Sequence, residues 1–103
     1  MNIREILSLN PIIAAVNSER LLEEASESEI VVVFVLYGTI LTIPGIVETL
    51  KEKGKTVIVH ADLINGLSGK DIAVDYIATR TRADGIISTR DNLVKRAKEL
   101  GLV

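Results

Sequence analysis

The sequence predicts an α/β fold made of parallel β/α repeats, amounting to about half of a TIM-type (β/α)8 barrel. Short apolar runs alternate with longer amphipathic segments, which is typical of β-α units that build a parallel sheet. The apolar runs carry few polar residues before their ends, as expected for strands covered on both faces. Neither GxGxxG nor GxxxxGK followed by Ser or Thr occurs, which disfavours an open nucleotide-binding sheet.

The length predicts one domain over residues 1–103, with four β-α units and the start of a fifth strand at Leu102–Val103. A complete barrel of this type takes ~250 residues, which is why this chain is expected to form about half of one. A short helix is expected over Met1–Leu9, before Pro11. The strands are expected at four apolar runs: Ile12–Val16, Ile30–Tyr37, Thr56–His60 and Asp84–Ser88.

A helix signal follows each predicted strand. Ser18 is a typical N-cap residue and Glu19 places an anion in the first turn, so the first of these helices is expected to begin here. Pro44 suits the first turn of the second helix, and Gly54 suits the left-handed position after its end. Gly101 is expected to close the last helix in the same way.

The third and fourth helices show weaker start signals and clear apolar stripes. Ser68 and Ser88 stand three residues before Asp71 and Asp91, which predicts variants of the capping box. Apolar residues at helical spacing predict the faces that pack on the core. These are Ile72, Ala73, Tyr76 and Ile77 in the third helix, and Leu93, Val94, Ala97 and Leu100 in the last.

Composition indicates a folded cytoplasmic protein that does not associate with membranes. The chain is 48% hydrophobic and 25% charged, which excludes general disorder. It has no cysteine, no basic leader before an apolar core, and no apolar segment near the ~20 residues that span a bilayer. The net charge is −2, and the few aromatic residues offer little surface on which single-stranded bases could stack.

Polar residues gather where the predicted strands end. In barrels of this type the carboxyl ends of the strands carry the functional site, so these residues are expected to converge on one rim. They are Asn17 after the first strand, Tyr37, Gly38 and Thr39 after the second, His60, Asp62 and Asn65 after the third, and Ser88, Thr89 and Arg90 after the fourth.

His60 and Asp62 allow more than one interpretation. Alternation along a strand places them on one side, where the single histidine would act as an acid-base group or a hydrogen-bond partner for phosphate. They are two metal ligands without a visible third, so no metal site is predicted. Equally, His60 is a satisfied interior residue, or Asp62 is a structural carboxylate that accepts backbone N–H groups from the following loop.

The start of the last helix predicts an anion site. If Ser88 or Thr89 caps the helix, its first free N–H groups and positive dipole face the rim beside the guanidinium of Arg90. The alternative is that Ser88 only caps the helix, while Arg90 pairs with Asp91 or with solvent.

Four stretches carry a resemblance to a known family, and together they cover nearly the whole chain. They are PIIAAV at 11–16, VHADLINGL at 59–67, ADGIISTRDNLVKRAKELGL at 83–102 and, more loosely, VVFVLYGTI at 32–40. In these stretches the chain resembles the amino-terminal part of the glycerol-3-phosphate-responsive antiterminators, also called glycerol uptake operon antiterminator proteins.

The resemblance implies a barrel-fold cytoplasmic regulator that needs no cofactor. Such a protein responds to glycerol 3-phosphate and acts on leader mRNA to prevent early termination of transcription. It implies that His60, Asp62, Ser88, Thr89 and Arg90 lie at the ligand rim.

The chain departs from the family pattern in two ways. Asn17 and Asn65 are amides where family members often carry basic, charged or imidazole side chains. Barrel phosphate sites often lie after the seventh and eighth strands, which four or five strands do not include.

Two other functions stay open at this point. An enzyme on the same scaffold would act on a small phosphorylated substrate, with His60 and Asp62 as acid and base. Alternatively, the chain is an inactive half-barrel fragment that self-associates. Four or five parallel strands leave an inner face and two sheet edges uncovered, which predicts a homodimer or higher oligomer.

Overall fold

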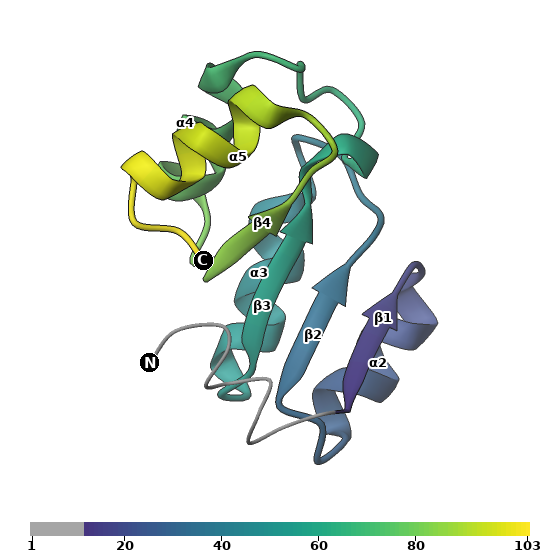
Figure 1. Ribbon diagram of the computed structural model, residues 1–103. Helices are drawn as coiled ribbons and strands as arrows, with labels where there is room; N and C mark the ends of the chain where they lie inside the picture. The colour runs from purple at the N-terminus through teal and green to yellow at the C-terminus, as the bar shows by residue number, and fades with distance from the viewer. Residues whose placement is uncertain (1–11) are drawn as a thin grey trace.

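The computed structural model describes residues 12–103 and contains one parallel sheet (Figure 1). Its strands are β1 (Ile13–Val16), β2 (Val32–Val35), β3 (Thr56–His60) and β4 (Gly85–Ile87). They pair in parallel in the spatial order β1-β2-β3-β4, so β1 and β4 are the outer strands. The helix predicted over Met1–Leu9 lies outside the described residues.

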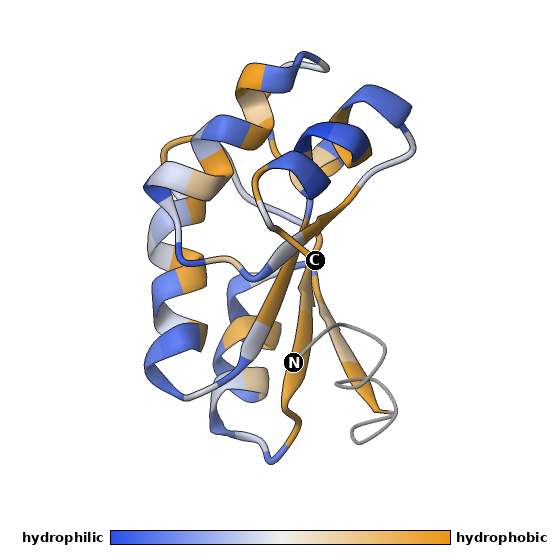
Figure 2. Cartoon of the chain, turned by 60° about the vertical axis from the view of Figure 1, so that its left-hand side comes forward, coloured by the Kyte–Doolittle hydropathy of each residue, from blue (hydrophilic) through white to orange (hydrophobic). Residues whose placement is uncertain are grey.

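Each strand is followed by a helix, and the helices lie on the same side of the sheet (Figures 1 and 2). They are α2 (Glu19–Glu27), α3 (Ile43–Glu52), α4 (Asp71–Arg80) and α5 (Asp91–Glu99), with a short 3₁₀ turn, η1 (Ala61–Leu63), directly after β3. Strands in sequence order with helices on one face are what consecutive units of a (β/α)8 barrel produce. The predicted fold class is therefore confirmed.

The core lies between the sheet and its helices. Strand residues alternate between the two faces, and the register places Val33, Val35, Val57 and Val59 on the face that the helices cover. These valines are fully buried with Leu50, Ile77 and Leu93 from the helices. Figure 2 shows the same division, because the strands are mostly hydrophobic and the helices carry hydrophilic stretches.

The opposite face carries a second row of side chains. The register aligns Ala15, Phe34 and Ile58 across β1, β2 and β3, and His60 follows Ile58 on the same face of β3. Ala15 is exposed, Phe34 is half-buried and Ile58 is buried. His60 therefore belongs to the face that is turned away from the helices.

The predicted start and end signals are correct for α2 and for the turns after α3 and α5. The Leu21 N–H donates to Oγ of Ser18, which is the N-cap of α2, and Pro44 lies in the first turn of α3. Gly54 and Gly101 adopt φ values of +77° and +79°, the left-handed region in which glycine is favoured.

Two capping predictions and part of two apolar stripes are wrong. The N-caps of α4 and α5 are Lys70 and Arg90, and neither receives a side-chain cap, so Ser68 and Ser88 do not cap these helices. The buried face of α4 is formed by Ala73, Val74 and Ile77. Ile72 lies outside this face and is 66% exposed. Val94 and Leu100 are 37% and 38% exposed and lie at the margins of the stripe on α5.

Val103 continues the sheet at the outer edge of β4. Its N–H donates to the Asp84 carbonyl at 3.0 Å, and its carbonyl accepts from the Ile86 N–H at 3.2 Å. This is the position of the predicted fifth strand. No helix within residues 12–103 is long and apolar enough to cross a membrane.

Candidate functional site

The loops that follow β3 and β4 meet around the carboxylate of Asp62. β3 ends at His60, and Asp62 lies in the 3₁₀ turn that follows, so its direction is set by this turn and not by strand alternation. Ser88 Oγ donates to Asp62 Oδ1 at 2.9 Å. The backbone N–H and Oγ1 of Thr89 donate to Asp62 Oδ2 at 2.8 and 3.1 Å. The polar residues that follow β3 and those that follow β4 thus contact each other at Asp62.

These hydrogen bonds hold the pKa of Asp62 below its ordinary value. The main cause is the Thr89 backbone N–H, and the hydroxyls of Ser88 and Thr89 act in the same direction. The charge of nearby His60 contributes a smaller effect, while partial burial opposes the shift. The Asp62 side chain is only 17% exposed, which by itself disfavours the charge, so the hydrogen bonds from Thr89 and Ser88 are what stabilise its ionised form.

Asp62 explains why Ser88 and Thr89 do not cap α5. Both hydroxyls and the Thr89 N–H are directed at this carboxylate, and Ser88 Oγ accepts the N–H of Arg90 at 3.0 Å. The anion that this loop holds is therefore a side chain of the protein. The structural interpretation of Asp62 was right that its carboxylate accepts a backbone N–H, but the donor comes from the loop after β4 and not from the loop that follows Asp62.

Arg90 extends this cluster towards solvent. Its Nε lies 3.7 Å from Asp62 Oδ1, and its side chain is 58% exposed, so the guanidinium is oriented by Asp62 without being enclosed. It pairs with Asp62 and not with Asp91, so the expected Asp91 pair is wrong, while the side chain still meets solvent as the same alternative expected. A planar guanidinium held by one nitrogen keeps its two terminal NH2 groups available for an anion.

Gly69 and Asn92 also shape this cluster, and the sequence did not reveal them. A Cβ on Gly69 would lie 2.7 Å from Nη1 of Arg90, so only glycine leaves room for the guanidinium in its present position. Asn92 Nδ2 donates to the Gly69 carbonyl at 2.9 Å and to Asp71 Oδ1 at 3.1 Å. Together they hold the loop after β3 against the start of α5. The two residues are 23 positions apart in sequence, so no local pattern predicts that they meet.

His60 has an unsatisfied nitrogen. Its Nδ1 is buried and makes no hydrogen bond to the described part of the chain. Buried polar atoms normally have a partner, so this nitrogen is a position where a bound molecule would gain a hydrogen bond. The alternative of a satisfied interior histidine thus finds no partner for Nδ1 among residues 12–103.

Asn65 and Asn17 lie apart from the Asp62 contacts. The backbone of Asn65 bonds to the loop after β2, through the Gly38 carbonyl at 3.0 Å and the Ile40 N–H at 2.8 Å. Asn17 follows β1, the outer strand on the other edge of the sheet from β4 (Figure 1). The structure therefore brings together Asp62, Ser88, Thr89 and Arg90, and places Asn17 at the far edge.

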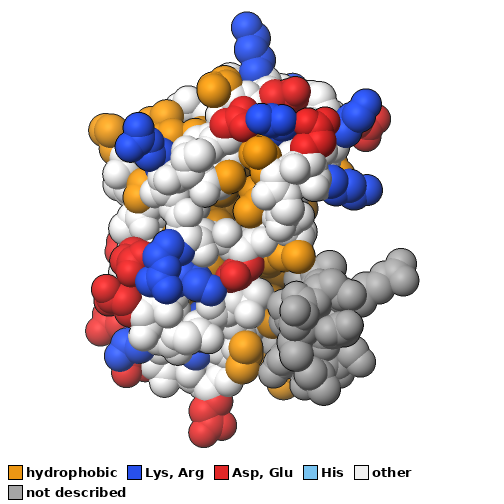
Figure 3. Space-filling view, turned by 90° about the vertical axis from the view of Figure 1, so that its left-hand side faces the viewer, with side chains coloured by type: hydrophobic (Ala, Val, Ile, Leu, Met, Phe, Trp, Pro, Cys, Tyr) orange, Lys and Arg blue, Asp and Glu red, His pale blue; other side chains and the backbone are white. Residues whose placement is uncertain are grey.

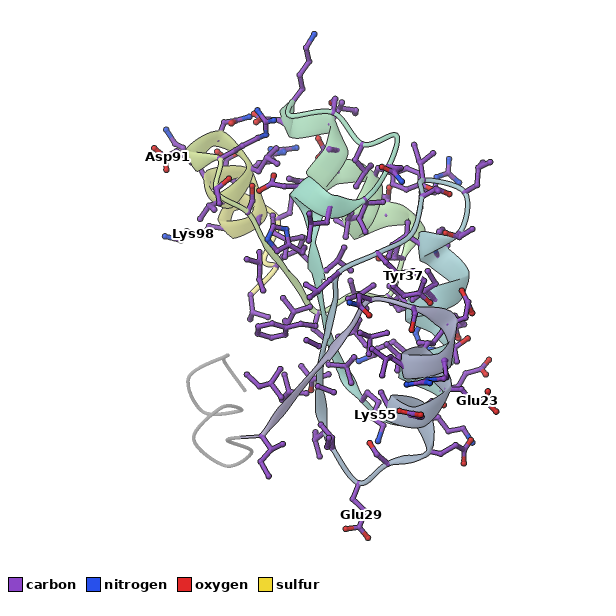
Figure 4. All side chains as sticks on the ribbon, turned by 90° about the vertical axis from the view of Figure 1, so that its right-hand side faces the viewer. Glu23, Glu29, Tyr37, Lys55, Asp91 and Lys98 are labelled. Atoms are coloured by element: carbon purple, nitrogen blue, oxygen red, sulfur yellow. The ribbon has the colours of Figure 1, made fainter. Side chains whose placement is uncertain are left out.

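Tyr37 lies two residues after the end of β2 and is hydrogen-bonded to α2. Its hydroxyl donates to Glu19 Oε1 at 3.0 Å. Burial and this contact with a carboxylate raise the pKa of Tyr37 to about 12, so the phenol stays protonated at physiological pH. Figure 4 shows Tyr37 beside α2. Within residues 12–103, no three His, Asp or Glu side chains are placed to hold a metal ion together.

Comparison with known proteins identifies the family. Residues 12–103 match the family model described as glycerol-3-phosphate responsive antiterminator. The chain belongs to this family. It is also 41% identical, over 98% of its length, to the uncharacterized protein YgcP of Escherichia coli (strain K12), of which it covers 53%.

Two solved structures of the antiterminator family have the same fold. The glycerol uptake operon antiterminator regulatory protein of Listeria monocytogenes matches with a TM-score of 0.83 and 33% identity, over 87% of this chain and 49% of that one. A glycerol uptake operon antiterminator-related protein of Thermotoga maritima matches with a TM-score of 0.76 and 33% identity, over 88% and 51%. The chain thus spans about half the length of the relatives it matches.

Proposed function

We propose that this chain is a regulator that binds glycerol 3-phosphate at the rim formed by the loops after β3 and β4, and that it acts on leader mRNA to prevent early termination. Family membership supports the regulatory role over catalysis. The observation that carries the ligand site is Arg90, an exposed guanidinium oriented by Asp62 at the carboxyl edge of the sheet.

The contacts of Asp62 suggest which residue of the rim would bind which part of the ligand. The donors of Ser88 and Thr89 are already directed at Asp62, so these residues serve to position Arg90. The terminal NH2 groups of Arg90 would bind the phosphate, because a guanidinium fork matches two phosphate oxygens. The Nδ1 of His60, which has no partner within residues 12–103, would bind a glycerol hydroxyl. Asn65 lies in the segment after β3 that hydrogen-bonds to the loop after β2, and its side-chain amide would also bind the ligand.

RNA binding would use basic side chains, and those on and near α4 and α5 differ in whether an acidic residue already pairs with them. Arg82 pairs with Glu48 at 2.8 Å, and Arg96 pairs with Asp75 at 2.7 Å. In Figure 3 charged side chains of both signs lie side by side over α4 and α5. Lys95 and Lys98 are exposed and form no ion pair within residues 12–103, so they are the better candidates for phosphate contacts. We include a homodimer in this proposal, because within residues 12–103 no strand pairs with the outer side of β1, and only Val103 pairs with the outer side of β4.

Thermal unfolding with added ligand tests this function. Glycerol 3-phosphate should raise the unfolding midpoint with concentration, since a ligand that binds only the folded state stabilises it by mass action. Arg90→Ala should abolish the rise, and Arg80→Ala, which removes the same charge from the exposed last turn of α4, should retain it. Glycerol and inorganic phosphate are measured in parallel to separate the contributions of the two ends of the ligand.

Two results would contradict the proposed site. One is an unchanged midpoint for the unmodified chain at millimolar glycerol 3-phosphate. The other is an equal rise for Arg90→Ala and the unmodified chain, which would place the ligand elsewhere on the protein.

A further inference from the structure

The two outer edges of the sheet have different helical flanks. One edge consists of β1 with α2, and the other consists of β4 with α5 (Figure 1). Outer strands present unpaired N–H and C=O groups that can pair with another strand. Within residues 12–103, Val103 is the only residue that pairs with the outer side of β4.

A groove runs along the edge formed by β1 and α2. It has a volume of about 310 Å³ and is lined mainly by small and apolar residues, with Glu24 at its margin. The lining residues include Ala14 and Val16 of β1, and Leu21 and Ala25 of α2. The other side of α2, with Leu22 and Ser26, lies against α3. The groove therefore exposes the flank of α2 that lies away from the rest of the molecule.

The side of α5 that faces away from α4 carries an apolar and a basic residue. Asn92 and Arg96 bond to residues of α4, so they mark the side of α5 that faces α4. Val94 and Lys98 lie two positions further along, which is about 200° round the helix, and are therefore on the opposite flank. Val94 is 37% exposed, and Figure 4 shows Lys98 projecting away from the molecule.

The two flanks are complementary in both polarity and charge. One presents Leu21 with Glu24, whose carboxylate also lies 3.7 Å from Nε of Arg20 in the same helix. The other presents Val94 with the exposed Lys98. The helices as a whole are also opposite in charge. α2 carries four glutamates and one arginine, whereas α5 carries three basic and two acidic residues. Neither flank contacts the other within one chain, because β1 and β4 are separated by two strands.

We propose that a second copy of this chain occupies both edges, with its β1–α2 edge against the β4–α5 edge of the first copy. A twofold axis makes both contacts identical, so two copies close eight parallel strands into one barrel. The size fits, because this chain covers 49% of the Listeria chain and 51% of the Thermotoga chain. This inference deepens the proposed homodimer and rests on it.

The arrangement would complete the candidate site in trans. In a closed sheet, β1 of one copy lies beside β4 of the other, and their carboxyl ends share one rim. Asn17 of the second copy would then lie beside Ser88 and Arg90 of the first. This residue is remote from Arg90 within a single chain only because β1 and β4 are at opposite edges.

Val103 competes with the second copy for the edge of β4. It occupies the Asp84 carbonyl and the Ile86 N–H, two groups that a partner strand would use. A variant that lacks Val103 should therefore dimerise more tightly.

Charge reversal tests the proposed interface. Sedimentation of the unmodified chain should give twice the monomer mass of 11.2 kDa at micromolar concentration. Glu24→Lys and Lys98→Glu should each raise the dimer Kd roughly tenfold or more, because the contact occurs twice per dimer. The double variant should return to within about threefold of the unmodified chain, since the pair is restored with its signs exchanged.

The matched control uses the same changes elsewhere on the same helices. Glu23 lies in the groove between α2 and α3, and Lys95 lies on the exposed face of α5, so Glu23→Lys and Lys95→Glu should leave the Kd unchanged. Circular dichroism checks that each variant is folded. A dimer that responds to neither Glu24→Lys nor Lys98→Glu would overturn this interface. A monomer would overturn the dimer itself, while a monomer that still binds glycerol 3-phosphate would leave the ligand proposal intact.

Discussion

Asp84 and Asp62 lie at opposite ends of the same two strands and are used differently. At the amino end, Asp84 Oδ2 accepts the Val57 N–H at 2.8 Å and lies 2.9 Å from Nζ of Lys51. At the carboxyl end, Asp62 accepts the Thr89 N–H at 2.8 Å, but its cation, Arg90, is 3.7 Å away.

The difference lies in how tightly each cation is held. The side chain of Lys51 is 19% exposed and makes two hydrogen bonds to Asp84, so its charge is used within the fold. The Arg90 side chain is 58% exposed. Within residues 12–103 it makes no hydrogen bond, and its ion pair with Asp62 spans 3.7 Å. Asp84 thus stabilises the amino end of β3 and β4, whereas Asp62 positions an exposed guanidinium at their carboxyl end. In complete barrels of this type the functional site lies at the carboxyl ends of the strands, the end at which Arg90 lies here.

The largest expected effect on stability comes from Asp84. Asp84→Ala should lower the free energy of unfolding by about 2–3 kcal/mol, because it leaves the Val57 N–H and the Lys51 ammonium without partners. Asp62→Ala should cost about 1–2 kcal/mol, since its donors are nearer to solvent. Urea unfolding measures both, with the exposed Asp91→Ala as a control. A larger loss for Asp62→Ala than for Asp84→Ala would break the comparison.

The pH dependence of stability should identify the contribution of Asp62. Its pKa is lowered in the folded state, so its stabilisation is fully present above the unfolded value of about 3.9. It is lost as pH falls through the lower, folded value. The difference in unfolding free energy between the unmodified chain and Asp62→Asn should therefore be constant above about pH 5 and should shrink below pH 4. A difference that grows as the pH falls below 4 would show that the carboxylate destabilises this loop.

The smallest expected effect comes from Gly69. Gly69→Ala would place a Cβ 2.7 Å from Nη1 of Arg90, so the guanidinium must move, and affinity for glycerol 3-phosphate should fall a few-fold with little change in stability. Gly45→Ala is the matched control. A Cβ at Gly45 meets nothing within 4 Å in α3, so this change should add about 0.5–1 kcal/mol to stability and leave affinity unchanged. Equal affinities for the two variants would show that the position of the Arg90 guanidinium does not affect ligand binding.

The strands could be predicted well because their burial leaves a clear signal. The run Thr56–His60 was predicted with its observed bounds, and the other three strands were predicted one to four residues too long. Parallel strands covered by helices are apolar throughout, so composition alone marks them. Their ends are less clear, since apolar residues also flank the strands, as Val31 does before β2 and Leu36 after it.

The rim residues were predicted, but their contacts were not. Strand ends in a parallel sheet share an edge, which is why Asp62, Ser88, Thr89 and Arg90 were expected together. The capping prediction for Ser88 or Thr89 was wrong because a carboxylate 26 residues away in sequence takes their hydrogen bonds. A local rule cannot include an acceptor that only folding brings near.

The sequence by itself determined the elements, their parallel order and the edge at which polar residues gather, because these follow from local periodicity and from the short range of β-α connections. Only the tertiary structure decided that Asp62 holds the loop after β4, that Gly69 makes room for Arg90, and that Asn17 lies at the far edge. Hydrogen bonds and close packing depend on distances of a few ångströms between segments far apart in the chain, and those distances arise when the strands assemble.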